Sequence, residues 1–194
     1  MTALIFGLLL FLGLHSVRIV ADDWRSGMVA RLGAQRWKGL YTLLSLAGFA
    51  LIVWGYGQAR LAPVPLWSPP LWTRHLAGLL MLVSMLLLAA AYVPRNALKA
   101  RLQHPMVLAV KVWALAHLLA NHTLADLLLF GGFLLWAVAC FRSARRRDRA
   151  AGTVAAAATT AGTLTTVAVG VLAWAALAFW GHAALLGVRP FAVG

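Results

Sequence analysis

Acidic residues are nearly absent from this 194-residue chain, which contains no glutamate and four aspartates. Charged residues of both signs make up only 11% of the sequence, whereas 63% of the residues are hydrophobic. A soluble domain of this length would carry more charge, so the composition indicates a membrane protein with several spans. The shortage of carboxylates also argues against hydrolytic chemistry, which commonly relies on acidic groups.

Cysteine is equally scarce, because Cys140 is the single thiol of the chain. One cysteine excludes both an internal disulfide and a multi-cysteine metal site. The first twenty residues also lack the features of a cleaved signal peptide, since no cation precedes the apolar run and no A-x-A-like site follows it. We therefore expect an uncleaved first span with the N-terminus outside.

Long apolar stretches account for most of the chain. A membrane-spanning helix needs ~20 mostly apolar residues, and six stretches approach or reach this length: 3–20, 39–59, 75–93, 105–120, 124–141 and 164–188. The sequence therefore predicts an all-α fold, a polytopic transmembrane bundle of about six helices. We expect one domain over 1–194, with a cytoplasmic linker at 142–163 before the last helix.

The basic residues follow this predicted topology. The net charge is +13, and all Lys and Arg residues except Arg60, Arg74 and Arg189 lie in or beside the predicted cytoplasmic loops. This distribution satisfies the positive-inside rule, so the excess charge is a topology signal and nucleic acid is excluded as a partner. The first of these loops begins at Asp22, and we expect it to form a short helix along the inner membrane surface.

Two local signals mark helix starts around the fourth and fifth spans. Pro105 is suited to the first turn of a helix. Thr123 and Asp126 form a T-x-x-D capping box before the fifth span. We interpret Asp126 as a helix cap rather than as a catalytic acid.

Histidines are the main candidates for a functional site. His75, His122 and His182 lie near predicted outer helix ends or turns, where interfacial water can solvate them. His15 and His117 lie inside apolar spans, where an ionisable residue is costly and is by default a functional hypothesis. The alternative is that these two rings only form hydrogen bonds between helices.

Helical geometry groups the polar neighbours of these rings. His15 shares a face with Arg18 at a spacing of three residues, and His117 shares one with Trp113 and Asn121 at four residues. His104 lies about 20° from Lys111 around the helix axis but about 140° from His117. His104 and His117 therefore cannot easily serve the same small site.

Neutral imidazoles on facing helices of a bundle are natural axial ligands for haem iron. By depth alone, His15 can pair with His117, with a tilted ring plane, or with His104, with an upright one. Arg18, Arg101 and Lys111 lie on the predicted cytoplasmic side, where carboxylate groups of a ligand would need cations.

Five segments of the sequence resemble the NnrU family of bacterial integral membrane proteins, which are linked to nitrite and nitric oxide reduction. They are HSVRI (15–19), RWKGLYTLLSLAGFALIVWGY (36–56), LLLAAAYVP (86–94), HPMVLAVKVWALAHLLANHTLADLLLFGGFLLWAV (104–138) and LGVRPF (186–191). The domain is also similar to 15-cis-zeta-carotene isomerase, a membrane enzyme with haem b. The resemblance implies a multi-pass protein of the bacterial inner membrane.

The resemblance to the isomerase also implies a ligand set. Its H-S and A-H pairs correspond to His15 and His117, which become the expected axial ligands of haem b. Arg18, His104, Lys111, Trp113 and Asn121 complete the expected cofactor-binding residues. A cysteine of the isomerase, proposed as an alternative ligand, corresponds to Ala114 here, so ligand exchange of that kind is not expected to carry over.

Three classes of function follow. The leading hypothesis is a haem b-binding membrane protein associated with denitrification, in redox, sensing or isomerase-like chemistry, with nitric oxide or a lipophilic small molecule as partner. The second is a methyltransferase that uses S-adenosylmethionine, although its R-H-P motif has Gln103 in place of arginine. The third is a cofactor-free assembly factor for a reductase.

Overall fold

The computed structural model describes residues 1–191, and their regular structure is helical apart from an isolated bridge between Pro65 and Thr123. Five helical segments are long and apolar enough to cross a membrane: α1 (Thr2–Val20), α3 (Ala34–Leu61), α4 (Trp72–Tyr92), α7 (Leu124–Ala150) and Thr160–Leu186. The last combines α8 (Thr160–Ala176), a π-helical turn η1 (Leu177–Gly181) and α9 (His182–Leu186). The all-α prediction is confirmed, and the chain is a multi-pass membrane protein.

The remaining helices are shorter. α6 (Pro105–Ala120) is the predicted fourth span, and its 16 residues measure about 24 Å, less than the ~30 Å of a bilayer core. α5 (Ala97–Leu102) precedes it. α2 (Asp22–Leu32) confirms the helix predicted in the first loop, while its place at the inner membrane surface and the outside N-terminus stay predictions.

The linker before the last span is shorter than the sequence predicted. α7 continues through the arginine-rich segment to Ala150, and α8 begins at Thr160. Arginine has a high helix propensity, and cations near a helix C-terminus interact favourably with its dipole. The arginine run therefore extends α7, and the non-helical linker is confined to residues 151–159.

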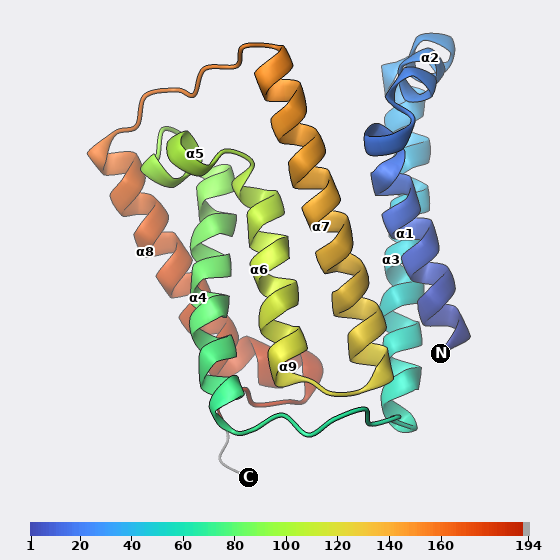
Figure 1. Cartoon of the computed structure of the whole chain (residues 1–194), viewed down its shortest axis with the longest axis vertical. Helices are drawn as coiled ribbons and strands as arrows, with labels where there is room; N and C mark the ends of the chain where they lie inside the picture. Colours follow the sequence, from blue (N-terminus) through green and yellow to red (C-terminus); the bar gives the residue numbers. More distant parts are fainter. Residues whose placement is uncertain (192–194) are drawn as a thin grey trace. The chain divides into compact units, whose positions relative to one another are not determined.

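The contacts within the chain divide it into two compact units. The first contains Met1–Trp67 and His122–Cys140, and the second contains Ser68–Asn121 and the chain from Phe141 onward. In the first unit α1 lies beside α3 (Figure 1). Their approach depends on glycine, because a Cβ on Gly55 would lie 2.3 Å from the backbone nitrogen of Leu4. Small residues permit such close packing of membrane helices.

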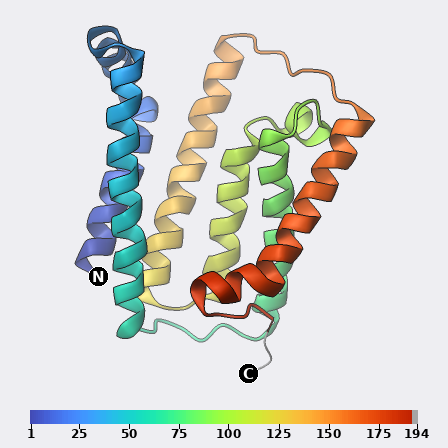
Figure 2. The same ribbon diagram turned by 180° about the vertical axis from the view of Figure 1, so that it is seen from behind.

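In the second unit α4 packs against both α6 and α8 (Figure 2). The Ser84 hydroxyl on α4 donates a hydrogen bond to the Ala109 carbonyl on α6 at 2.9 Å. Asn96, which is 1% exposed, accepts from the Lys99 backbone at 2.8 Å as the N-cap of α5. Its amide nitrogen also donates to the carbonyls of Ala90 and Val93. Asn96 thereby joins the end of α4 to the start of α5.

Candidate functional site

His15 lies in an aromatic environment within the first unit. Its ring stacks on Phe11 of the preceding turn, with centroids 4.1 Å apart and planes inclined by 26°. Tyr41 of α3 lies 5.3 Å from the imidazole centroid, and Trp136 of α7 meets it edge-on at 6.1 Å. Three helices therefore hold this ring.

The hydrogen bond of His15 determines its protonation state at one nitrogen. Its Nδ1 lies 2.7 Å from the Phe11 carbonyl oxygen, which can only accept, so Nδ1 carries the proton. In a neutral ring the other nitrogen, Nε2, is then a base with an available lone pair. Within residues 1–191 this Nε2 has no hydrogen-bond partner.

A second polar atom near His15 is also unpaired. The indole Nε1 of Trp136 is buried and has no hydrogen-bond partner within the described part of the chain. Buried polar atoms usually have partners, and an exception needs an explanation. The indole ring that carries this unpaired donor meets the imidazole of His15 edge-on.

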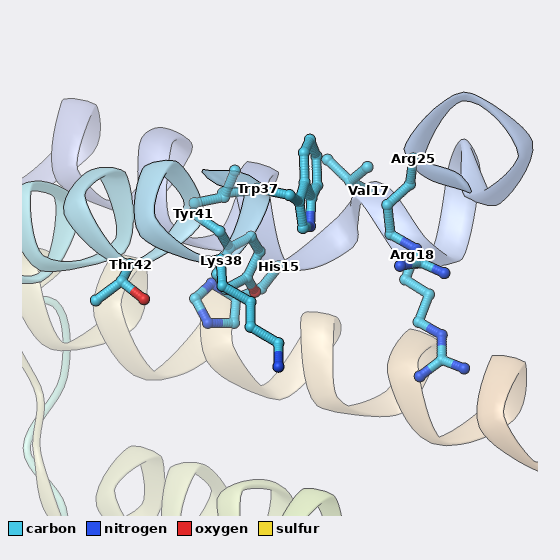
Figure 3. Close-up of a pocket in the computed structure, with 9 residues that line it drawn as sticks. His15, Val17, Arg18, Arg25, Trp37, Lys38, Tyr41 and Thr42 are labelled. Atoms are coloured by element: carbon cyan, nitrogen blue, oxygen red, sulfur yellow. The ribbon is translucent and has the colours of Figure 1, made fainter. Parts of the chain in front are cut away.

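A cavity of about 350 Å³ opens beside His15 in the first unit. Arg18, Arg25 and Lys38 line it together with Tyr41, as the close-up in Figure 3 shows. The prediction that Arg18 accompanies His15 is therefore reflected in the structure, since both residues line the same cavity. Lys38 was not among the residues singled out from the sequence, because no spacing rule connects it with His15.

His117, which lies in the second unit, has the same hydrogen-bonding arrangement as His15. Its Nδ1 lies 2.9 Å from the Trp113 carbonyl oxygen, four residues earlier, and so donates to it. The two rings are also in contact, with centroids 5.2 Å apart. The side chain of Asn121 donates to the His117 carbonyl at 2.8 Å at the end of α6. The predicted grouping of these three residues is thus present as a set of local contacts.

His104 has a hydrogen-bond partner of a different kind, a carboxylate. It precedes Pro105 in a left-handed conformation, with φ of 43°, and Pro105 begins α6 as predicted. Its Nε2 lies 2.6 Å from a carboxylate oxygen of Asp148, so the ring is held by an acidic partner on α7. Arg145 lies 3.8 Å from the same oxygen. No spacing rule could pair His104 with an aspartate 44 residues away.

Lys111 has no hydrogen-bond or ion-pair partner within residues 1–191. It lies inside α6 between apolar residues and is partly buried. An unpaired cation at such a position is expensive unless an anion or water meets it. Lys111 therefore remains a candidate for an anionic group of a ligand.

Asp126 is confirmed as a cap. Its carboxylate accepts hydrogen bonds from the Thr123 backbone at 2.9 Å and the Thr123 hydroxyl at 2.7 Å. The Thr123 hydroxyl in turn accepts from the Asp126 backbone at 3.2 Å, which completes the reciprocal capping box. The second carboxylate oxygen accepts from the Tyr56 hydroxyl at 2.5 Å, a tertiary contact between α3 and α7.

Comparison with known proteins supports one family assignment. The profile of the family described as NnrU protein matches residues 3–190, which is nearly the whole chain. No curated protein and no solved structure matches the chain. Because the match extends from the first span to the segment after the last one, this multi-pass membrane protein belongs to the NnrU family.

Proposed function

We propose that this protein binds haem b through His15 and His117 and functions alongside the reduction of nitrite and nitric oxide. One observation supports the ligand assignment most strongly. Each ring donates its Nδ1 proton to the carbonyl four residues earlier, at 2.7 Å for His15 and 2.9 Å for His117. Metal-bound histidines usually donate a hydrogen bond from their second ring nitrogen in this way, which would keep the lone pair of Nε2 for iron.

The residues around His15 suit a porphyrin. Phe11, Tyr41 and Trp136 offer aromatic surfaces to a flat apolar macrocycle. The unpaired Trp136 indole N–H is available to a polar group of the cofactor or of a ligand next to it. Arg18 and Lys111 are the cations proposed to meet the propionate carboxylates.

Within residues 1–191, no three His, Cys, Asp or Glu side chains come together in a group that could hold a metal ion. A porphyrin would provide four nitrogen ligands itself and require only axial ligands from the chain. When bound, haem would supply redox chemistry or a coordination position for a small molecule such as nitric oxide.

In this proposal the protein contributes binding, orientation and exclusion of water. The carbonyls of Phe11 and Trp113 hold the two imidazoles in the required tautomer. The Phe11 and Tyr41 rings, which lie against the imidazole of His15, would limit the access of water to a group bound there. His104, whose Nε2 contacts Asp148, is assigned a supporting role within the second unit in this proposal.

The first test is an absorption spectrum of the full-length protein, purified in detergent from haem-replete cells, in its oxidised and reduced forms. We expect stoichiometric haem with a Soret band and sharp reduced α and β bands. His15→Ala and His117→Ala should lose these features, whereas His122→Ala, at an exposed position, should retain them. A colourless wild type, or ligand variants with an unchanged spectrum, would refute the proposal.

Two further measurements separate ligand loss from misfolding and address the function. Imidazole added to His15→Gly and His117→Gly should restore the bound spectrum if each ring is a ligand. Nitrite-grown cells that depend on the protein should lose their nitrogen-oxide phenotype with His15→Ala but not with His122→Ala. If the wild type is colourless, calorimetry with S-adenosylmethionine separates the methyltransferase hypothesis from the assembly factor.

A further inference from the structure

The cations that line the cavity beside His15 outnumber the carboxylates that form ion pairs with them. Its lining includes three cations, Arg18, Arg25 and Lys38. Arg25 donates from Nε to the Asp22 carboxylate at 2.7 Å, so one carboxylate compensates one of the three. Arg18 and Lys38 have no ion-pair partner within residues 1–191. The cavity therefore offers an anion two cations without an ion pair within the described residues, and the remaining donors of a third.

The same cavity also has an apolar wall. Leu14 and Val17 of α1 and the ring of Trp37 complete its lining. Thr42 and Tyr41 add hydroxyl groups on the α3 side, as Figure 3 shows. A small inorganic anion would use only the polar part of this surface. An amphiphile with an anionic head and an apolar tail would use both parts.

The position of the cavity corresponds to the level of lipid head groups. It lies where α1 ends and α2 begins, and Trp24 of α2 meets Trp37 edge-on with ring centroids 6.0 Å apart. Trp24 is 56% exposed, and exposed tryptophans typically lie at the membrane–water interface. The positive-inside rule predicts that this end of the chain faces the cytoplasm, where the leaflet surface carries anionic lipids.

We infer that this cavity binds the phosphate of an anionic phospholipid. Lys38 and Arg18 contact the phosphate oxygens, and the free guanidinium nitrogens of Arg25 lie at the same head group. The start of an acyl chain follows Leu14 and Val17 along α1. Because His15 and Arg18 both line this cavity and are also proposed to contact haem, the two proposals must be tested with separate readouts.

The test uses the full-length protein, delipidated in detergent, and measures lipid binding by native mass spectrometry. The probes are dioleoylphosphatidylglycerol, dioleoylphosphatidylcholine and inorganic phosphate. We expect the wild type to bind phosphatidylglycerol more tightly than phosphatidylcholine by on the order of 10-fold. Arg18→Gln/Lys38→Gln should lose this preference.

A matched control removes the same charge from the same end of the molecule. Arg31 and Arg36 are exposed and do not line the cavity, so Arg31→Gln/Arg36→Gln should keep the preference for phosphatidylglycerol. If both double variants lose the preference for phosphatidylglycerol equally, the inference is overturned, because the general positive charge of this surface would then explain the preference. Competition by millimolar inorganic phosphate would overturn it in favour of a free anion.

Haem content is measured on the same samples. If Arg18→Gln/Lys38→Gln loses haem but retains the preference for phosphatidylglycerol, the cations serve a cofactor carboxylate and the lipid site is refuted. A wild type without haem that still prefers phosphatidylglycerol refutes the proposed cofactor and leaves the lipid site supported. The two proposals can therefore fail independently.

Discussion

Replacement of Asp126 by alanine should destabilise the protein by roughly 2–3 kcal/mol. Loss of an N-terminal cap costs about 1 kcal/mol. The hydrogen bond from Tyr56 to the buried carboxylate, 2.5 Å long, adds about 1–2 kcal/mol, because bonds to charged groups contribute roughly 1.5–3 kcal/mol in general and bonds between membrane helices contribute less. Because roughly 1 kcal/mol shifts the midpoint of a protein of this size by 2–4 °C, Tm should fall by about 4–12 °C.

The assay is thermal unfolding in one detergent, followed by circular dichroism. Tyr56→Phe removes only the tertiary bond and should cost about 1 kcal/mol, close to the small values measured between membrane helices. In the double variant the two losses should be less than additive, because both single changes remove the same contact. An Asp126→Ala protein with an unchanged Tm, or strictly additive losses, would refute the structural role assigned here.

Three other substitutions test packing and site assignment. Gly55→Leu should sharply reduce the yield of folded protein, because the added Cβ would overlap α1. Gly57→Leu should be tolerated, because nothing lies within 4 Å of its added Cβ, and size-exclusion profiles compare the two variants. Asn96→Ala should cost about 2 kcal/mol by removing a cap and leaving buried carbonyls unpaired, and thermal unfolding measures this. His104→Ala and Asp148→Asn should each leave any haem spectrum unchanged, because this pair lies outside the proposed ligand set; an altered Soret band would contradict that assignment.

The contrast between His104 and His117 shows why spacing alone left their roles open. Both rings lie on or next to α6, and sequence geometry allowed either to pair with His15. The structure distinguishes them by their hydrogen bonds: Nε2 of His104 meets Asp148, whereas His117 uses Nδ1 to meet a carbonyl of its own helix. In a neutral ring these bonds leave the lone pair on Nε2 in His117 and on Nδ1 in His104, and the proposed ligand assignment uses the first.

Features that depend on nearby residues could be predicted from the sequence. The apolar runs specified the spans because a bilayer selects for length and hydropathy. The capping box of Thr123 and Asp126 was predictable because its partners are three residues apart. The contacts of His117 with Trp113 and Asn121 follow from helical spacing in the same way.

Features that join distant segments were decided by the tertiary structure. No spacing rule predicts that Tyr41 and Trp136 contact His15. The same holds for the bond from Tyr56 to Asp126 and for the cavity that Lys38 shares with Arg18. Each depends on how closely two helices approach and on which faces they present. The distance between two helices depends on glycines, which have no side chain. Gly55, for example, lies directly against the backbone of Leu4. Periodicity can show that a helix is apolar all round, but only packing decides which of its faces meets another helix.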